Sequence, residues 1–167
     1  VLTQKYYEGS VPSPNAFFEI DTETLEKVKA FPASLSKSIE RYRFREASQE
    51  LMNLARLGNK YLADEEPWKL IKTDPERVQT IMYVALQVSA ALAIVSEPFL
   101  PTTSQKLKTM LQLPTHSWEA VEKGATLLEP AHQIGTATLL FAKIEDAEIE
   151  HQLEKLAQSK LANTLSN

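Results

Sequence analysis

The chain contains no cysteine among its 167 residues, which excludes disulfide bonds and cysteine-bound zinc sites. Glycine is scarce as well, with four residues, and this argues against an all-β fold with many turns. No P-loop and no GxGxxG pattern is present. Apolar residues make up 43% of the chain and charged residues 24%, which fits one ordered helical domain with a core of its own.

Residues suited to catalysis or metal binding do not cluster in the sequence. His116, His132 and His151 lie far apart, a distribution typical of scattered surface histidines and not of a metal site with its supporting shell. Glu65 and Glu66 precede a proline, where we expect solvated charges favoured by the positive end of a helix dipole. The sequence therefore predicts no catalytic residue and no metal ligand in this chain.

The rest of the chain is organised around the stretch 44–72. Its apolar residues recur at helical spacing and predict a long helix with one buried face: Leu51, Leu54, Ala55, Leu57 and Leu62. Pro67 disfavours the helical conformation at Glu66 and suits the first turn of a new short helix. Trp68, just inside that helix, is interpreted either as a partly buried packing residue or as a flat surface for a ligand.

Start signals predict further helices on both sides of this stretch. Asp21 is expected to cap one helix, and Pro32 is expected to break or kink it. The sequence 74–76, Asp-Pro-Glu, opens another helix, which carries the apolar run 81–95. That run holds about 15 residues, whereas a membrane-spanning helix needs about 20, so we expect a central buried helix.

The C-terminal part is less regular. Residues 124–144 contain glycines and a proline and predict an irregular or extended segment, whose apolar stretch 138–141 should lie against the bundle. Residues 145–167 are polar and predict a marginal terminal helix that leads into a linker. The expected fold is all-α: a helical bundle over residues 1–144 with this short irregular segment at its end, followed by the polar helix.

Charge is spread unevenly along the chain. The net charge of −4 gives no global attraction to nucleic acid or acidic membranes. The segment 36–60 nevertheless carries six basic residues against three acids, Glu40, Glu46 and Glu50; the basic ones are Lys37, Arg41, Arg43, Arg45, Arg56 and Lys60. A solvated helix face is one interpretation. The other is a surface for RNA phosphates beside an aromatic that stacks on an unpaired base.

Five motifs, in order, give the chain a family resemblance: LTQKYYEG, FREA…LMNLARLGNKYL, DEEPWKL, EPFLPTTSQKL and LLFAKIED. Together they cover nearly the whole chain, which resembles the C-terminal anticodon-binding domain of bacterial methionyl-tRNA synthetases. The resemblance implies a helical bundle appended to a class I catalytic domain. That catalytic domain makes methionyl-AMP from ATP and charges elongator and initiator tRNA with methionine.

The resemblance also implies a site that reads the CAU anticodon. The tryptophan of the family's PW motif stacks on the first anticodon base, cytosine, and this role carries over to Trp68, with Pro67 setting its position and Asn59 nearby. A family asparagine and arginine that also hold the anticodon would precede Val1. Candidate phosphate contacts are the basic residues Arg43, Arg45, Lys60 and Lys5.

Cofactors and partners follow from the same resemblance. We expect no cofactor in this chain, while ATP, and any zinc, belong to the catalytic domain of a longer cytoplasmic protein. The chain has no initiator methionine, and residues 1–8 resemble a helix end closed by Gly9, so we expect a segment of that protein. The final polar helix and residues 163–167 resemble the linker that, in many bacterial members, leads to a further tRNA-binding domain, and no membrane contact is expected. The alternative is a helical protein–protein docking module without nucleic-acid binding.

Overall fold

The computed structural model describes the backbone of residues 2–165 and the side chains of residues 2–159. The described chain is all-α, as predicted, and its order of elements is α1 (Leu2–Tyr7), α2 (Glu19–Glu40), α3 (Phe44–Glu65), α4 (Pro67–Leu70), α5 (Pro75–Val95), α6 (Pro101–Leu111), α7 (Trp118–Glu122) and α8 (Asp146–Leu165). Over residues 2–165 the only β-pairing is an isolated bridge between Ser10 and Gln133.

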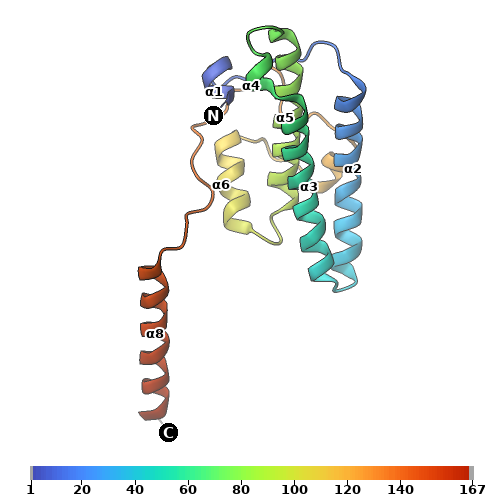
Figure 1. The fold of residues 1–167 in the computed structure, drawn as a ribbon. Coiled ribbons are helices and arrows are strands. Elements are labelled where there is room, and N and C mark those ends of the chain that lie inside the picture. Colours follow the sequence, from blue (N-terminus) through green and yellow to red (C-terminus); the bar gives the residue numbers. More distant parts are fainter. Residues whose placement is uncertain (1, 166–167) are drawn as a thin grey trace.

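Helix α5 is the centre of the bundle. It contacts α2, α3, α4, α6 and α7, and α2 and α3 form a long antiparallel hairpin beside it (Figure 1). Its length and composition would suffice for a membrane crossing, but 78% of its most apolar stretch is buried by the other helices. This burial confirms the prediction of a central core helix.

Helix α5 also begins where the sequence predicts. Asp74 caps it, and the Asp74 carboxylate accepts the backbone N–H of Arg77 at 3.0 Å. Pro75 takes the first helical position, where an N–H group would have no partner within the helix, so the N–H that proline lacks costs no hydrogen bond. These local signals act within four residues, which explains why the sequence alone located them.

Two predictions about α2 are wrong: Asp21 as its cap and a break at Pro32. The helix begins at Glu19, not after Asp21, and Asp21 is its third residue, whose carboxylate accepts the N–H of Phe18 at 2.8 Å. The helix also continues through Pro32, which is buried. Helix α2 contacts α3, α5 and α7, and it has buried residues on both sides of Pro32, such as Val28 and Leu35, so this packing outweighs the lost backbone hydrogen bond.

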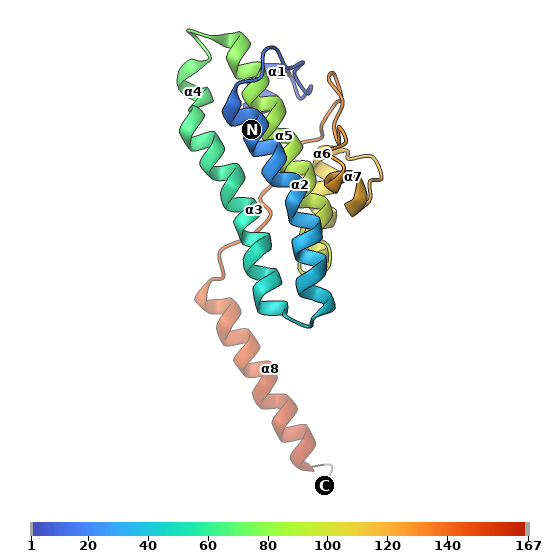
Figure 2. The same ribbon diagram turned by 90° about the vertical axis from the view of Figure 1, so that its right-hand side faces the viewer.

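The irregular segment divides into two parts. Leu127 and Leu128 are buried, and the side chain of Gln87 holds both: its Nε2 donates to the Leu128 carbonyl at 2.7 Å, and its Oε1 accepts the Leu127 N–H at 2.9 Å. The expectation that residues 138–141 also pack on the bundle is wrong for Leu139, which is 89% exposed, and for Phe141. The chain leaves the bundle here, and α8 extends away from it (Figure 2).

Replacing Leu54 with alanine should lower the free energy of unfolding by about 2–5 kcal/mol. Leu54 lies on α3 and is fully buried against the neighbouring helices, so the substitution leaves a cavity. Urea unfolding measures the change. The matched control is Leu139→Ala, at an exposed leucine, which should change stability by less than about 0.5 kcal/mol. Equal effects of the two substitutions would contradict the orientation of α3.

Candidate nucleic-acid interface

The corner between α3 and α4 carries the half-exposed tryptophan. Helix α3 ends at Glu65, and Glu66 adopts a left-handed backbone conformation, with φ of +42°, that turns the chain sharply. Pro67 then occupies the first position of α4 and is buried. This arrangement leaves the next side chain, Trp68, 47% exposed at the surface.

The two tryptophans of the chain differ in their surroundings. Trp118 is partly buried against the core, and its indole N–H donates to the Ile94 carbonyl at 3.2 Å. The indole N–H of Trp68 has no hydrogen-bond acceptor among the residues that the structure describes. Trp118 therefore acts as a packing residue, and Trp68 presents a ring that a ligand can reach.

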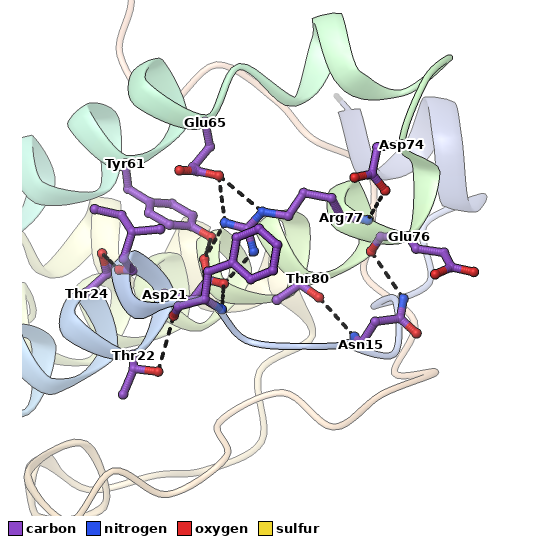
Figure 3. Close-up of polar contacts among 12 residues, drawn as sticks. Asn15, Asp21, Thr22, Thr24, Tyr61, Glu65, Asp74, Glu76, Arg77 and Thr80 are labelled. Atoms are coloured by element: carbon purple, nitrogen blue, oxygen red, sulfur yellow. Dashed lines mark hydrogen bonds and ion pairs between the residues drawn. The ribbon is translucent and has the colours of Figure 1, made fainter.

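A buried ion-pair network lies behind this corner (Figure 3). Its centre is Arg77 of α5, which is 6% exposed. The Arg77 guanidinium contacts both carboxylate oxygens of Asp21 on α2, with the bond from Nη2 to Oδ1 at 2.8 Å. It also donates to Glu65, the last residue of α3, from Nη2 at 2.6 Å and from Nε at 3.2 Å. One arginine thus joins three helices.

Two aromatic residues complete the network. The hydroxyl of Tyr61, on α3, donates to Asp21 Oδ1 at 2.5 Å in the buried interior. The ring of Phe18 lies against Arg77, with 4.3 Å between the ring centroid and the guanidinium carbon. Because every polar group has a partner, the network fixes α2, α3 and α5 relative to one another at the end that bears Trp68.

The ionisation of the network follows from its contacts. Burial alone would raise the pKa of the Asp21 carboxyl, but hydrogen bonds from Arg77, Tyr61 and Phe18, with the charge of Arg77, lower it below its ordinary value. Burial and the contact with Asp21 raise the pKa of Tyr61. Burial would lower the pKa of Arg77, and its two carboxylate partners raise it instead. The network is therefore a stable charged cluster at neutral pH.

The interpretation of Glu65 as a solvated charge is wrong, because this carboxylate pairs with Arg77 and is only 19% exposed. Sequence reasoning missed Arg77 altogether. One signal was available: Arg77 lies four residues before Ile81, so both share the inner face of α5. Its partner Asp21, however, lies 56 positions away, and sequence spacing does not reveal such a pairing.

Three predicted site residues lie on elements that reach the end of the bundle bearing Trp68. Asn59 and Lys60 are exposed on the second half of α3, and Lys60 pairs with Asp64 at 2.6 Å. Lys5 is exposed on α1, where its ammonium lies 5.1 Å from the centroid of the Tyr6 ring. Both views show α1 and α4 at the same end of the bundle (Figures 1 and 2). This end therefore combines an exposed aromatic with polar and basic side chains.

Arg43 and Arg45 lie elsewhere. They are exposed at the start of α3, whereas Trp68 follows its end. At 1.5 Å per residue, the 22 residues of α3 separate the two ends by about 33 Å. The two arginines and Trp68 therefore do not form one compact site.

The groups at this corner are suited to binding a ligand. In the part of the chain that the structure describes, no group of three or more histidine, aspartate or glutamate side chains is arranged to hold a metal ion. The corner instead presents a half-exposed aromatic ring at an end of the bundle that also carries exposed lysines. Such a surface suits a flat, anionic ligand such as an unpaired nucleotide.

Comparison with protein families gives one match that covers most of the chain. Residues 11–160 match the family described as the anticodon binding domain of methionyl tRNA ligase. Curated relatives include methionine–tRNA ligases of Christiangramia forsetii, 60% identical, and of Flavobacterium psychrophilum, 58% identical, each over 100% of this chain. The chain spans only 25% and 24% of their respective lengths.

Solved structures have the same fold. Apo methionyl-tRNA synthetase of Mycobacterium tuberculosis superposes with a TM-score of 0.78 over 86% of this chain and 30% of its own, at 21% sequence identity. The same synthetase in complex with methionyl-adenylate also gives 0.78, over 85% of this chain and 28% of its own, at 23% identity. The helical arrangement is thus shared with these structures.

Proposed function

Since this chain belongs to the family of anticodon-binding domains of methionyl-tRNA ligases, we propose that it binds the CAU anticodon loop of methionine tRNA and stacks Trp68 on the first anticodon base. The observation that carries this proposal is the half-exposed ring of Trp68 on a corner fixed by Pro67 and by the network beneath it. A rigid aromatic gains stacking energy without losing much side-chain freedom on binding.

Neighbouring residues have supporting roles in this proposal. Asn59 supplies amide donors and an acceptor for the edge of a base, and Lys60 and Lys5 supply positive charge for phosphates at the same end of the bundle. The ion pair of Lys60 with Asp64 is exposed and weak, so Lys60 can exchange Asp64 for a phosphate. Trp68 accordingly reads the base, and the lysines add affinity.

The rest of the longer protein follows from the family. The parent enzyme would use ATP to form methionyl-adenylate on a separate catalytic domain, with any zinc there, and would charge both elongator and initiator tRNA in the cytoplasm. In this proposal residues 1–144 form the binding unit and residues 145–167 a polar connector. The present chain, about a quarter of its relatives in length, positions the tRNA for that reaction.

A fluorescence titration tests the proposal directly. The chain carries Trp118→Phe so that Trp68 is the only tryptophan, and it is titrated with a CAU anticodon stem-loop and with one whose first anticodon base is changed. We expect the CAU loop to quench Trp68 and to bind more tightly, because base stacking brings the ring against the cytosine. Affinity should also fall steeply as salt rises, since phosphate contacts release counterions.

The competing function is a helical docking module for another protein, which would use the same exposed aromatic. Two results would favour it over anticodon binding: equal responses to the two loops, and an affinity that salt hardly changes. Repeating the titration with the longer protein, which supplies the residues before Val1, tests whether a weak response reflects a site shared with that preceding segment.

A further inference from the structure

The loop between α2 and α3 has an unusual surface. This loop and the first two residues of α3 carry five residues in which arginine and aromatic side chains alternate, here called the hairpin tip: Arg41, Tyr42, Arg43, Phe44 and Arg45. All five are exposed, with Tyr42 at 82% and Phe44 at 56%. The two rings contact each other edge to face, with centroids 6.2 Å apart. They form an aromatic surface in water, outside the core.

The backbone conformation at Tyr42 is unfavourable for a tyrosine, so the fold itself does not explain this side chain. Its φ is +58°, in the left-handed region that glycine adopts readily and a bulky side chain does not. A tyrosine with this backbone and an exposed ring contributes little to the core. Such strained positions often occur at binding sites, where the side chain is used for a contact outside the fold.

The arginines of the hairpin tip are available for a ligand. Within residues 2–159, Arg41 and Arg45 form no ion pair with any carboxylate. Arg43 pairs with Glu46 at 3.3 Å, but both side chains are more than half exposed, so the pair is weak. The tip therefore presents three guanidinium groups around two rings.

A mostly polar surface connects the hairpin tip with the other end of α3. Seven exposed residues at helical spacing form this surface, here called the α3 face, and none is acidic: Arg45, Gln49, Met52, Asn53, Arg56, Asn59 and Lys60. Arg56 and Lys60 also line a shallow groove between α2 and α3, together with Lys27. The α3 face runs along the helix from the tip towards Trp68.

We propose that the hairpin tip is a second RNA-binding site, which holds the body of the tRNA outside the anticodon loop. This inference rests on the proposed function, because it takes tRNA as the ligand. The arginines of the tip contact backbone phosphates, Tyr42 stacks on an unpaired base, and the α3 face follows the sugar–phosphate backbone in between. The length of α3, about 33 Å, sets the distance between the two contacts.

The chemistry of this surface favours RNA over a protein partner. Guanidinium groups bind phosphates and also stack on bases, and exposed aromatic rings bind unpaired bases of any sequence. An acid-free strip of arginine, lysine, asparagine and glutamine matches a polyanion over its whole length. The α3 face itself has one apolar member, Met52, and the apolar residues Ala30, Phe31 and Leu57 lie in the neighbouring groove.

Two variants and two RNAs test the inference. The variants are Tyr42→Gly and the double variant Arg41→Gln/Arg45→Gln, and the RNAs are a complete tRNA transcript with a CAU anticodon and its anticodon stem-loop alone. We expect Tyr42→Gly to weaken binding of the complete tRNA by about 5- to 150-fold and to leave stem-loop binding unchanged. The double variant should flatten the slope of log K against log salt by about 1 to 2, with the complete tRNA only.

Melting curves separate a binding role from a structural one. Tyr42→Gly should melt at the same temperature or higher, because glycine relieves the left-handed backbone. A charge control is Lys123→Gln, which removes an exposed cation just after α7 and should leave the affinity for both RNAs unchanged. If Lys123→Gln and the double variant weakened binding of the complete tRNA equally, the tip would contribute only general electrostatic attraction. That result would overturn the inference.

The remaining outcomes distinguish this inference from the proposed function. Full tRNA affinity in Tyr42→Gly and in the double variant, with stem-loop binding intact, overturns the second site and leaves anticodon binding standing. Loss of tRNA binding in Tyr42→Gly, with no preference for the CAU loop, supports the tip and overturns the anticodon site. Absence of binding to either RNA at low salt overturns both.

Discussion

Replacing Trp68 with alanine should weaken binding of the CAU stem-loop by about 5- to 150-fold, which corresponds to the loss of about 1–3 kcal/mol of base stacking. The same variant should melt close to the unsubstituted protein, because the ring is 47% exposed and lies outside the core cluster. Fluorescence anisotropy of a labelled stem-loop measures the affinity, and circular dichroism measures the melting temperature.

Tyr42→Gly is the matched control for this substitution, since it also removes an exposed aromatic ring, but at the opposite end of α3. It should leave stem-loop binding unchanged. A large drop in melting temperature for Trp68→Ala would show that the ring belongs to the core. Stacking on the first anticodon base would then be untenable, whatever the affinity of the variant.

The parts of the fold that the sequence predicted are those governed by local signals. Asp74 and Pro75 mark the start of α5 within two residues, and Pro67 marks the corner that exposes Trp68. Helical spacing also predicted correctly that Leu51 and Leu54 would be buried. Caps, proline and periodicity act over a few residues, so they can be recognised before the tertiary structure is known.

The errors arise where residues far away in the sequence determine the local structure. Asp21 has the side chain of a good cap, yet it is bonded to Arg77 and Tyr61 from two other helices, and α2 starts earlier as a result. Glu65 was predicted to be solvated, but it pairs with Arg77, which lies 12 residues away in the sequence. Arg45 and Trp68 lie at opposite ends of α3, about 33 Å apart along the helix, so Arg45 stays a candidate phosphate contact outside the corner that bears Trp68.

Replacing Arg77 with methionine should lower the free energy of unfolding by about 3–5 kcal/mol, because it leaves the fully buried carboxylate of Asp21 without its cation. Glu65 would lose its partner as well. Urea denaturation at pH 7 measures the loss. The matched control is Lys27→Met, which breaks the exposed pair with Glu23 and should change stability by less than about 0.5 kcal/mol.

The pH dependence identifies Asp21 as the cause. In the unsubstituted protein the folded pKa of Asp21 lies below its unfolded value, so its contribution is present above the unfolded pKa and is lost as pH falls through the folded pKa. Without Arg77, burial should raise the pKa of Asp21, and protonation would then relieve the buried charge. The stability difference between the two proteins should therefore narrow as pH falls from 7 towards about 4.

A second substitution isolates the unpaired charge from the lost contacts. The double variant Arg77→Met/Asp21→Asn has no buried carboxylate at position 21, while the amide oxygen still accepts the Tyr61 hydroxyl. It should be more stable than Arg77→Met at pH 7 and less sensitive to acid, because the charge that required Arg77 is gone. If both variants were equally unstable at every pH, lost packing around Arg77 would explain the effect, and the network would not be an electrostatic clamp. Because this network ends at Glu65, one residue before the turn that exposes Trp68, the same measurement also tests how firmly the binding corner is held.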